Sequence, residues 1–294
     1  MIRWGILSTA KIGLTSVAPA ILNAENGHLQ AIASETPGKA HTWLGELSKG
    51  TEQDLHHVTV YDSYEKLLTD PSIDAVYIPL PNSLHAKWAM KAADAGKHIL
   101  CEKPAAINAE EARQVIDHCR AKGVLFMEAF MYQFNPQYDR LRAIIAAGDI
   151  GKPKLIRSTF TFPLQNLGNI RYSKDLAGGS LMDVGCYCIH SSRLIFGQEP
   201  VSVVAQARMT GEVDNTMAGI LNFPGGEMAT FEVSFSQASR QSLEVVGETG
   251  VIIAHRPWKA EVEPATLSIG VSIGYEDKFK VETMPFVSSY KLQV

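Results

Sequence analysis

The sequence predicts an α/β protein, with an N-terminal Rossmann-type doubly wound parallel sheet and a C-terminal α+β domain that contains a large mixed or antiparallel sheet. Before about residue 125, short apolar strands alternate with amphipathic helices, which is typical of a parallel sheet covered on both faces. After Gly151 the chain changes to strands joined by turns such as Pro224-Gly225-Gly226, which predict hairpins. We therefore expect two domains, residues 1–125 and 126–294.

The composition argues against nucleic acid or a membrane as a partner. The chain has 294 residues, of which 46% are hydrophobic and 20% charged, and its formal net charge is -4. Proteins that bind nucleic acid or an anionic membrane are usually strongly basic. No apolar run reaches the roughly 20 residues that cross a bilayer, and the N-terminus lacks the pattern of a secretory signal peptide. We expect a cytoplasmic protein.

Six short apolar runs predict the strands of the first domain, and the helices between them follow from apolar residues at helical spacing. Ser63 can cap one helix, and Asn108 with Glu111 three residues later resembles a capping box. The expected strands cover residues 2–7, 29–33, 58–60, 75–78, 99–101 and 124–127. The expected buried helix faces are Leu14, Val17, Ala18, Ile21 and Leu22; Leu67 and Leu68; Leu84, Trp88, Ala92 and Ala95; and Ala112, Val115, Ile116 and Cys119.

The second domain is expected to be a sheet with one helix, over about residues 179–196. A second hairpin turn is predicted at Gly247-Glu248-Thr249-Gly250. The expected strands cover residues 154–162, 201–209, 215–223, 227–235, 243–246 and 251–255. Near the domain boundary the pattern is interrupted by Pro136, Gly148, Gly151 and Pro153.

These strands carry more apolar residues than one helix can cover. An uncovered apolar sheet face favours burial against a second subunit. We expect a homodimer or a dimer of dimers, assembled through a face that includes Ile220, Leu221, Phe223, Phe231, Val233 and Phe235.

The turn after the first strand is a candidate phosphate site. The usual dinucleotide fingerprint G-x-G-x-x-G reads here as Ser8-x-Ala10-x-x-Gly13, with two glycines replaced by small residues. Such a turn places a pyrophosphate at a helix N-terminus, where free N–H groups and the helix dipole favour an anion. An ordinary strand-to-helix turn is the alternative. The expected cofactor contacts here are Ser8, Thr9, Ala10, Lys11 and Ile12.

The end of the second strand, Ser34-Glu35, is the expected ribose site. A carboxylate there can accept hydrogen bonds from the adenosine ribose and repels a 2′-phosphate, which favours NAD over NADP. Lys39 follows closely and could contact a phosphate. The alternative for Glu35 is a solvated residue at a helix start.

Two further segments carry specific motifs. Residues 77–85 read Y-I-P-L-P-N-S-L-H and precede Glu102-Lys103-Pro104; residues 178–187 read G-G-S-L-M-D-V-G-C-Y. With Glu128-Ala129-Phe130-Met131-Tyr132 and Asn169-Ile170-Arg171, they resemble the glucose–fructose oxidoreductase / inositol dehydrogenase / rhizopine catabolism (Gfo/Idh/MocA) family over nearly the whole chain. Tyr187, where many members have histidine, resembles the glucose–fructose oxidoreductase and dimeric dihydrodiol dehydrogenase branch.

The resemblance implies an NAD(P)-dependent oxidoreductase that acts on a sugar, polyol or dihydrodiol. Lys103 matches the catalytic lysine beside the nicotinamide, Asp183 matches a carboxylate that contacts substrate, and Tyr187 matches their partner. Oxidation of an alcohol needs a base for the hydroxyl proton while hydride leaves to the nicotinamide. The resemblance also implies cofactor contacts by Pro79, Asn82, His85 and Glu102, and substrate contacts by Asn169 and Arg171.

The same three residues could also have purely structural roles. Lys103 could be a surface lysine, Asp183 a helix-start cap and Tyr187 a core tyrosine. A chain of this fold could also be a non-catalytic sensor that binds the dinucleotide. A metal at Cys186-x-Cys188-x-His190 is not expected, because a helix puts Cys188 off the face of the other two residues and a fourth ligand is missing. The four cysteines are expected to be free thiols.

Overall fold

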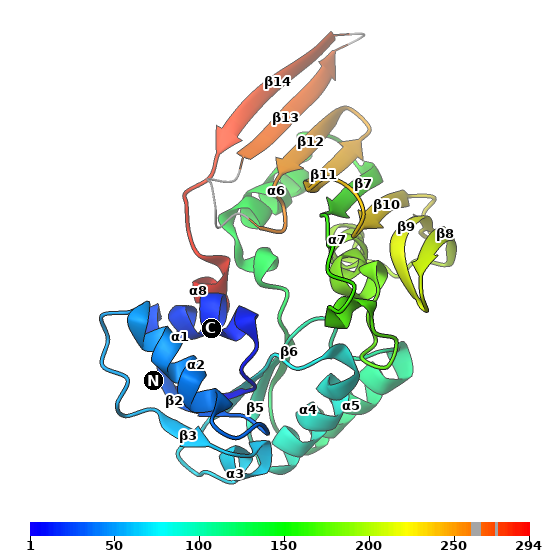
Figure 1. Ribbon diagram of the computed structural model, residues 1–294. Coiled ribbons are helices and arrows are strands. Elements are labelled where there is room, and N and C mark those ends of the chain that lie inside the picture. The colour runs from blue at the N-terminus through cyan, green and yellow to red at the C-terminus, as the bar shows by residue number, and fades with distance from the viewer. Residues whose placement is uncertain (260–265, 274–275) are drawn as a thin grey trace. The chain divides into compact units, whose positions relative to one another are not determined.

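The computed structural model describes residues 1–259, 266–273 and 276–294, and it divides the chain into two compact units. The first unit comprises Met1–Phe130 with Tyr290–Val294, and the second comprises Met131–Ser289. Figure 1 shows the chain, coloured from its N-terminus to its C-terminus. No helix in the described ranges is long and apolar enough to cross a membrane.

The first unit contains a parallel six-stranded sheet in the order β3-β2-β1-β4-β5-β6, which confirms the predicted doubly wound fold. The strand order reverses between β1 and β4. In sheets of this kind a ligand binds beyond the carboxyl ends of the strands at such a point. The strands are β1 (Ile2–Leu7), β2 (Gly27–Ala33), β3 (Thr59–Tyr61), β4 (Ala75–Ile78), β5 (His98–Cys101) and β6 (Phe126–Glu128).

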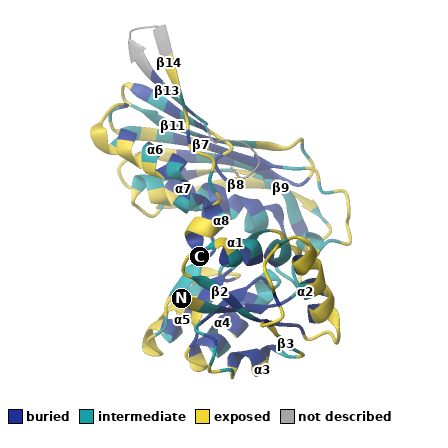
Figure 2. Cartoon of the chain, turned by 90° about the vertical axis from the view of Figure 1, so that its left-hand side faces the viewer, coloured by how far each residue is buried: buried dark blue, intermediate teal, exposed yellow. Residues whose placement is uncertain are grey.

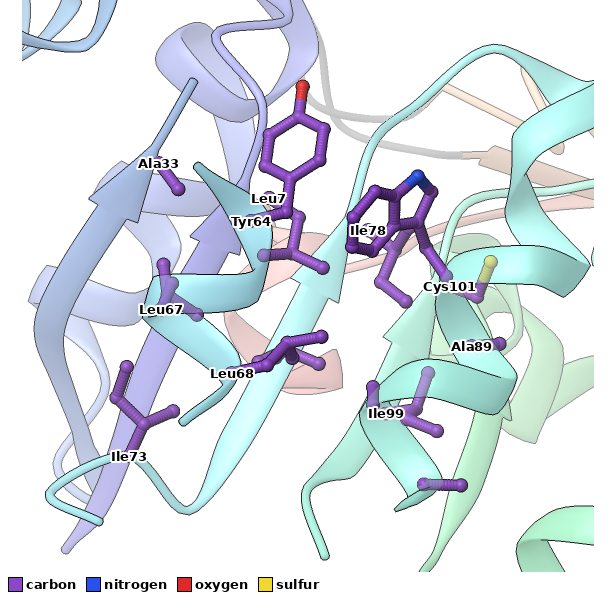
Figure 3. Close-up of a cluster of buried hydrophobic side chains, with 14 of the residues drawn as sticks. Leu7, Ala33, Tyr64, Leu67, Leu68, Ile73, Ile78, Ala89, Ile99 and Cys101 are labelled. Atoms are coloured by element: carbon purple, nitrogen blue, oxygen red, sulfur yellow. The ribbon is translucent and has the colours of Figure 1, made fainter. Parts of the chain in front are cut away.

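Helices cover both faces of this sheet, and each face has its own hydrophobic cluster. One cluster joins the sheet to α1 and α2 and also receives Tyr290 and Val294. The other joins the sheet to α3, α4 and α5 (Figure 3). The central strands are largely buried, the edge strands β3 and β6 are half-buried or exposed, and the outer faces of the helices are exposed (Figure 2). The helices are α1 (Ala18–Asn23), which follows a π-helical turn over Gly13–Val17, α2 (Lys39–Lys49), α3 (Tyr64–Leu68), α4 (His85–Asp94) and α5 (Ala109–Ala121).

Both predicted caps of the first unit are confirmed. The Ser63 side chain accepts the N–H of Lys66, and that of Asn108 accepts the N–H of Glu111. Two predicted buried residues are wrong: Ala95 lies beyond the end of α4 and is exposed, and Ile116 is 44% exposed on α5. Helix α2 is not among the predicted helices.

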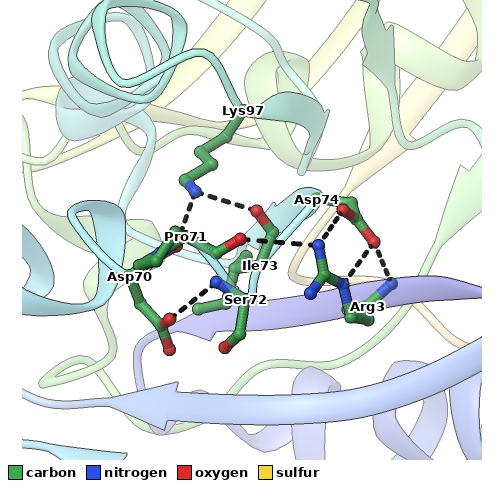
Figure 4. Close-up of polar contacts among 7 residues, drawn as sticks. All are labelled: Arg3, Asp70, Pro71, Ser72, Ile73, Asp74 and Lys97. Atoms are coloured by element: carbon green, nitrogen blue, oxygen red, sulfur yellow. Dashed lines mark hydrogen bonds and ion pairs between the residues drawn. The ribbon is translucent and has the colours of Figure 1, made fainter.

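Polar contacts hold the amino ends of the strands in place (Figure 4). Arg3 on β1 holds Asp74, which precedes β4, through Nη2–Oδ1 and Nε–Oδ2 contacts of 2.7 and 2.9 Å. Lys97, which precedes β5, is buried and donates to the carbonyl oxygens of Asp70 and Ile73. The hydrogen bond from Arg3 lowers the pKa of Asp74 to about 2. These contacts hold the strands together at their amino ends. The carboxyl ends of the strands remain for ligand binding.

The second unit contains an eight-stranded mixed sheet in the order β14-β13-β12-β11-β7-β10-β9-β8. Among the described strands of this second sheet only β7 and β10 pair in parallel, and both predicted hairpins, β9–β10 and β11–β12, are confirmed. The strands are β7 (Pro153–Thr161), β8 (Ser202–Thr210), β9 (Val213–Asn222), β10 (Met228–Ser234), β11 (Arg240–Gly247), β12 (Gly250–His255), β13 (Thr266–Ile273) and β14 (Glu276–Thr283).

Two helices, α6 (Pro136–Ala147) and α7 (Cys186–Phe196), contact this sheet, where the sequence predicts only the second; the short α8 (Ser289–Gln293) ends the chain. A π-helical turn over Leu181–Gly185 precedes α7. Because strand side chains alternate, one sheet face packs under the helices and the other stays open. The apolar face predicted for dimerisation is therefore wrong in five of six residues: Ile220 is 41% exposed, but the interior holds Leu221, Phe223, Phe231, Val233 and Phe235.

Candidate active site

The predicted phosphate turn connects β1 to the first helical turn at the carboxyl end of the sheet. Ser8 is buried and has a φ of 131°, a conformation that favours glycine, which the usual fingerprint has here. Its Oγ donates to the carbonyl of Pro79 at 2.9 Å and accepts the N–H of Ala10 at 3.2 Å. Ser8 thus ties the turn to the loop after β4, across the point where the strand order reverses.

The turn fits a dinucleotide phosphate. The helix that begins at Lys11 presents first-turn N–H groups, which have no partner within the helix. Thr9, Ala10 and Ile12 are half-buried around it and Lys11 is exposed. A residue that the sequence did not single out, Trp43 on α2, donates from Nε1 to the carbonyl of Ala10 at 3.4 Å and supports the turn from behind. The sequence contains a pattern that indicates α2 and the burial of Trp43, because Ala40, Trp43 and Leu47 recur at helical spacing.

The end of β2 presents Glu35 at the surface. Ser34 is buried, and its Oγ accepts the N–H of Thr36 at 3.1 Å. The Glu35 carboxylate accepts the N–H of Tyr64, at the start of α3, at 2.9 Å. Lys39 is exposed at the first position of α2. The carboxylate of Glu35 is therefore held at the strand end by a backbone contact.

Lys103 follows β5 directly, at the carboxyl end of the parallel sheet, and is half-buried. Its neighbour Glu102 accepts a hydrogen bond from the hydroxyl of the fully buried Tyr77 at 2.6 Å. Burial and the Glu102 carboxylate raise the pKa of Tyr77 well above its usual value, so its hydroxyl remains a donor. Asn82, in the turn after β4, is half-buried.

His85 occupies the interior of the first unit. Its side chain has no accessible surface, and its ring nitrogens Nδ1 and Nε2 lie 2.7 and 2.8 Å from the carbonyl oxygens of Pro104 and Leu80. Burial lowers the pKa of His85. The residue thus joins the two loops that carry Asn82 and Lys103.

In the second unit, Arg171 holds Asp183. The guanidinium Nε donates to Asp183 Oδ2 at 2.6 Å, and Asn169 Oδ1 accepts the backbone N–H of Arg171 at 3.0 Å. The carbonyl of Arg171 in turn accepts the N–H of Gly179. A Cβ on Gly178 would lie 2.3 Å from that carbonyl oxygen, so only glycine permits this close approach. The G-G-x-x-x-D spacing therefore brings the three predicted substrate residues together.

Asp214 on β9 supports the same segment, although no local sequence pattern indicates this role. Its Oδ2 accepts from Ser180 Oγ at 2.6 Å and from the N–H of Leu181 at 2.8 Å. A Cβ on Gly179, whose φ is +111°, would lie 2.2 Å from Asp214 Oδ1. Asp214 thus fixes the start of the π-helical turn that carries Asp183.

Tyr187 lies in the first turn of α7 and is buried. Its ring packs at centroid distances of 5.5 to 5.9 Å from the rings of Phe160, Tyr132 and Trp258. Its hydroxyl lies 3.7 Å from the sulfur of Met131. The aromatic neighbours fix the ring while Asp183, four residues earlier, is oriented by Arg171.

The region of Cys186 and Cys188 shows no metal arrangement. Cys188 is fully buried, which raises its pKa to about 12, and Cys186 is half-buried. His190 Nδ1 lies 2.5 Å from the hydroxyl of Tyr132, and burial lowers its pKa to about 4. Within the described residues, no cluster of three His, Cys, Asp or Glu side chains could hold a metal ion, and the four cysteines are free thiols.

Comparison with known proteins identifies the class that this fold and these residues define: a two-domain, dinucleotide-dependent oxidoreductase. Residues 2–130 match the oxidoreductase family with an NAD-binding Rossmann fold, and residues 138–253 match the GFO/IDH/MocA C-terminal domain. The chain belongs to the Gfo/Idh/MocA family. The predicted family and its NAD(P)-dependent oxidoreductase class are thus confirmed.

Individual relatives are similar over most of the chain. A D-xylose 1-dehydrogenase (NADP(+)) from Haloferax volcanii is 40% identical over 99% of this chain and 86% of the relative. A trans-1,2-dihydrobenzene-1,2-diol dehydrogenase from Xenopus laevis is 32% identical over 85% of this chain and 74% of the relative. The crystal structure of KijD10, a 3-ketoreductase from Actinomadura kijaniata with NADP and TDP-benzene, has a TM-score of 0.89 and 27% identity and covers 99% of this chain and 86% of its own.

Proposed function

We propose that this protein is an NAD(P)-dependent dehydrogenase or reductase of a polyhydroxylated substrate, a sugar or polyol. The observation that carries this proposal is the position of Lys103, at the carboxyl end of the parallel strand β5, which pairs with β4 at the reversal point of the sheet. We assign the first unit to the dinucleotide and the second to the substrate. The named relatives are a D-xylose dehydrogenase, a dihydrodiol dehydrogenase and a 3-ketoreductase, and both xylose and a 1,2-dihydrodiol carry neighbouring hydroxyl groups.

Each residue then has a chemical task. The bound nicotinamide supplies the hydride acceptor or donor. Lys103 takes the hydroxyl proton in oxidation and returns it in reduction. Tyr187 assists Lys103, and Asp183, oriented by Arg171, accepts a hydrogen bond from a substrate hydroxyl. Ser8 to Ile12 bind the pyrophosphate through backbone N–H groups.

A cofactor-linked absorbance screen tests this function. Aldoses, inositols and dihydrodiols are offered with both NAD and NADP, and turnover of at least one is expected. If the protein binds a dinucleotide and turns over none of these substrates in either direction, the enzyme proposal fails in favour of a binding protein.

For the cofactor we propose a preference for NAD that depends on Glu35. The held carboxylate at the end of β2 suits two ribose hydroxyls and repels a 2′-phosphate. The xylose dehydrogenase and the ketoreductase complex are both named with NADP. The proposed preference for NAD therefore differs from these relatives and rests on Glu35.

Replacement of Glu35 by arginine is expected to raise kcat/KM for NADP relative to NAD by about 10- to 100-fold, because it exchanges a like charge for an opposite one. Glu35→Gln is the matched control, since it removes the charge and keeps an acceptor for the N–H of Tyr64. Steady-state kinetics with both cofactors measure the ratio. A wild-type protein that is more efficient with NADP would contradict this role of Glu35.

We further propose that the open sheet face forms a homodimer. Val204 and Ile220 are paired across β8 and β9 and are 67% and 41% exposed, and Met228 on β10 is 44% exposed. A surface with several large apolar side chains on adjacent strands favours association. Light scattering is expected to give a dimer or larger at micromolar concentration. Ile220→Lys should shift it toward the monomer, whereas Leu125→Lys, at an exposed residue of the first unit, should not; a monomeric wild type contradicts the proposal.

A further inference from the structure

The peptide bond between Pro104 and Ala105, one residue beyond Lys103, is held by a side chain at each of its polar atoms. Its carbonyl oxygen lies 2.7 Å from Nδ1 of His85. Its N–H donates to Oε1 of Glu128 at 2.8 Å. One peptide plane is therefore bound on both sides, at the residue pair that follows the proposed base.

The two side chains come from elements on opposite sides of β5. His85 begins α4, after β4, and its second ring nitrogen lies 2.8 Å from the carbonyl of Leu80. Glu128 ends β6, where it pairs in register with Cys101, the last residue of β5. The loop after β5 is thereby tied to both of its neighbouring strands. His85 is fully buried and Glu128 is half-buried, so water competes little for the contact to Pro104.

The backbone before Lys103 is fixed as well. The N–H of Glu102 donates to the carbonyl of Ile78 at 3.1 Å, and its carboxylate accepts from Tyr77 at 2.6 Å. The peptide before Glu102 and the peptide after Pro104 are therefore both held, and Lys103 lies in the short segment between these two anchors.

We propose that His85 and Glu128 form a peptide clamp that positions Lys103 for proton transfer, a role that rests on the proposed function of that lysine. In the tautomer that carries its proton on Nδ1, His85 donates to the carbonyl oxygen, and the Glu128 carboxylate accepts from the N–H of the same amide. The two bonds polarise the amide in the same sense and strengthen each other. Both are positioning residues, because they act through the backbone next to Lys103. The role also explains Glu128 in the E-A-F-M-Y segment, which the proposed function otherwise leaves without a task.

The test compares Glu128→Leu and Glu128→Gln with the wild type. Leucine removes the acceptor for the N–H of Ala105, and kcat is expected to fall by about 10- to 100-fold, since a displacement of about 1 Å in a catalytic group costs about that much. KM for the dinucleotide should change by less than about threefold, because the pyrophosphate binds elsewhere. Glutamine keeps an acceptor oxygen, so Glu128→Gln should recover most of the lost kcat.

Hydrogen exchange gives a readout that needs no substrate. The amide of Ala105 should exchange faster in Glu128→Leu than in the wild type, while other amides of β5 keep their protection. Glu111→Ala is the matched control, because the Glu111 carboxylate also accepts a backbone N–H, that of Ile107, at 2.8 Å. It should leave kcat and the exchange of Ala105 unchanged.

His85→Leu completes the experiment, and its combination with Glu128→Leu should be less than additive, because both side chains fix one peptide. If His85→Leu does not fold, the Glu128 variants decide alone. A folded Glu128→Leu with unchanged kcat, or with unchanged exchange at Ala105, overturns the clamp. If Lys103→Met abolishes turnover and Glu128→Leu does not, only the clamp fails; if Lys103→Met is harmless, the proposed function of Lys103 fails.

Discussion

Replacement of Lys103 by methionine is expected to lower kcat by about 10²- to 10⁴-fold, the contribution typical of a general acid–base group. Lys103 stands where parallel sheets place ligands, and its removal leaves the substrate hydroxyl without the proposed base. Methionine retains much of the aliphatic stem, so packing and stability should change little. Cofactor-linked turnover of the substrate found in the screen gives the measurement, with a thermal melt as the check on folding.

Three comparisons make this result specific. Dinucleotide affinity should change by only a fewfold, because backbone N–H groups after β1 bind the pyrophosphate. Lys49→Met, at an exposed position on α2, should leave kcat unchanged. Tyr187→Phe should lose less than Lys103→Met, and the double variant should be less than additive if the two act together. Near-normal turnover by folded Lys103→Met would move the proton transfer to Tyr187 or to a bound water.

The first unit was predictable where local and tertiary preferences agree. Strand β4 was predicted with its observed bounds, Ala75–Ile78, because a parallel strand covered on both faces must be apolar at every position. Ser63 marked the start of α3 because its side chain satisfies an N–H that the helix itself cannot. The parallel sheet with helices on both faces followed from the alternation of strands and helices.

Helix α6 shows how a correct observation can be misread. In the sequence, Pro136 and Gly148 interrupt the strand-and-helix pattern and indicate a domain boundary. In the structure Pro136 is the first residue of α6, Asn135 caps it, and Gly148 ends it with a φ of +77°. Proline at a helix start and glycine at its end are typical signals. The wrong dimer face has another cause, because α6 contacts β13, whereas β9 and β10 contact the π-helical turn before α7 and β10 also contacts α7 itself.

Helix α2 lacked a start signal. Its N-cap is Gly38, with a φ of +76° and no capping side chain, so only the stripe of Ala40, Trp43 and Leu47 indicated it.

In the candidate site, the position of Lys103 followed from the apolar run of β5. The contacts of Asp214 and Glu128 join residues 33 and 23 positions apart, and no local pattern predicts such pairs. The peptide clamp could therefore be found only in the structure.

Replacement of Asp183 by asparagine is expected to lower kcat/KM for the substrate by about 10²-fold. The ionised carboxylate is the acceptor proposed for a substrate hydroxyl, and a hydrogen bond to a charged group contributes about 1.5–3 kcal/mol, which corresponds to about 10- to 150-fold. Asparagine keeps the size of the side chain, and Arg171 can still donate to its amide oxygen, so the π-helical turn should remain. KM for the dinucleotide should not change.

The matched control is Asp175→Asn, an exposed aspartate in the loop between Arg171 and Asp183, which should leave kcat/KM unchanged. Arg171→Leu should produce a loss similar to that of Asp183→Asn, because an unoriented carboxylate meets the hydroxyl in fewer productive geometries. The double variant should then be less than additive. If Asp183→Asn stays within about threefold of the wild type while Arg171→Leu loses activity, the guanidinium itself binds the substrate, and Asp183 serves to hold Arg171 rather than the reverse.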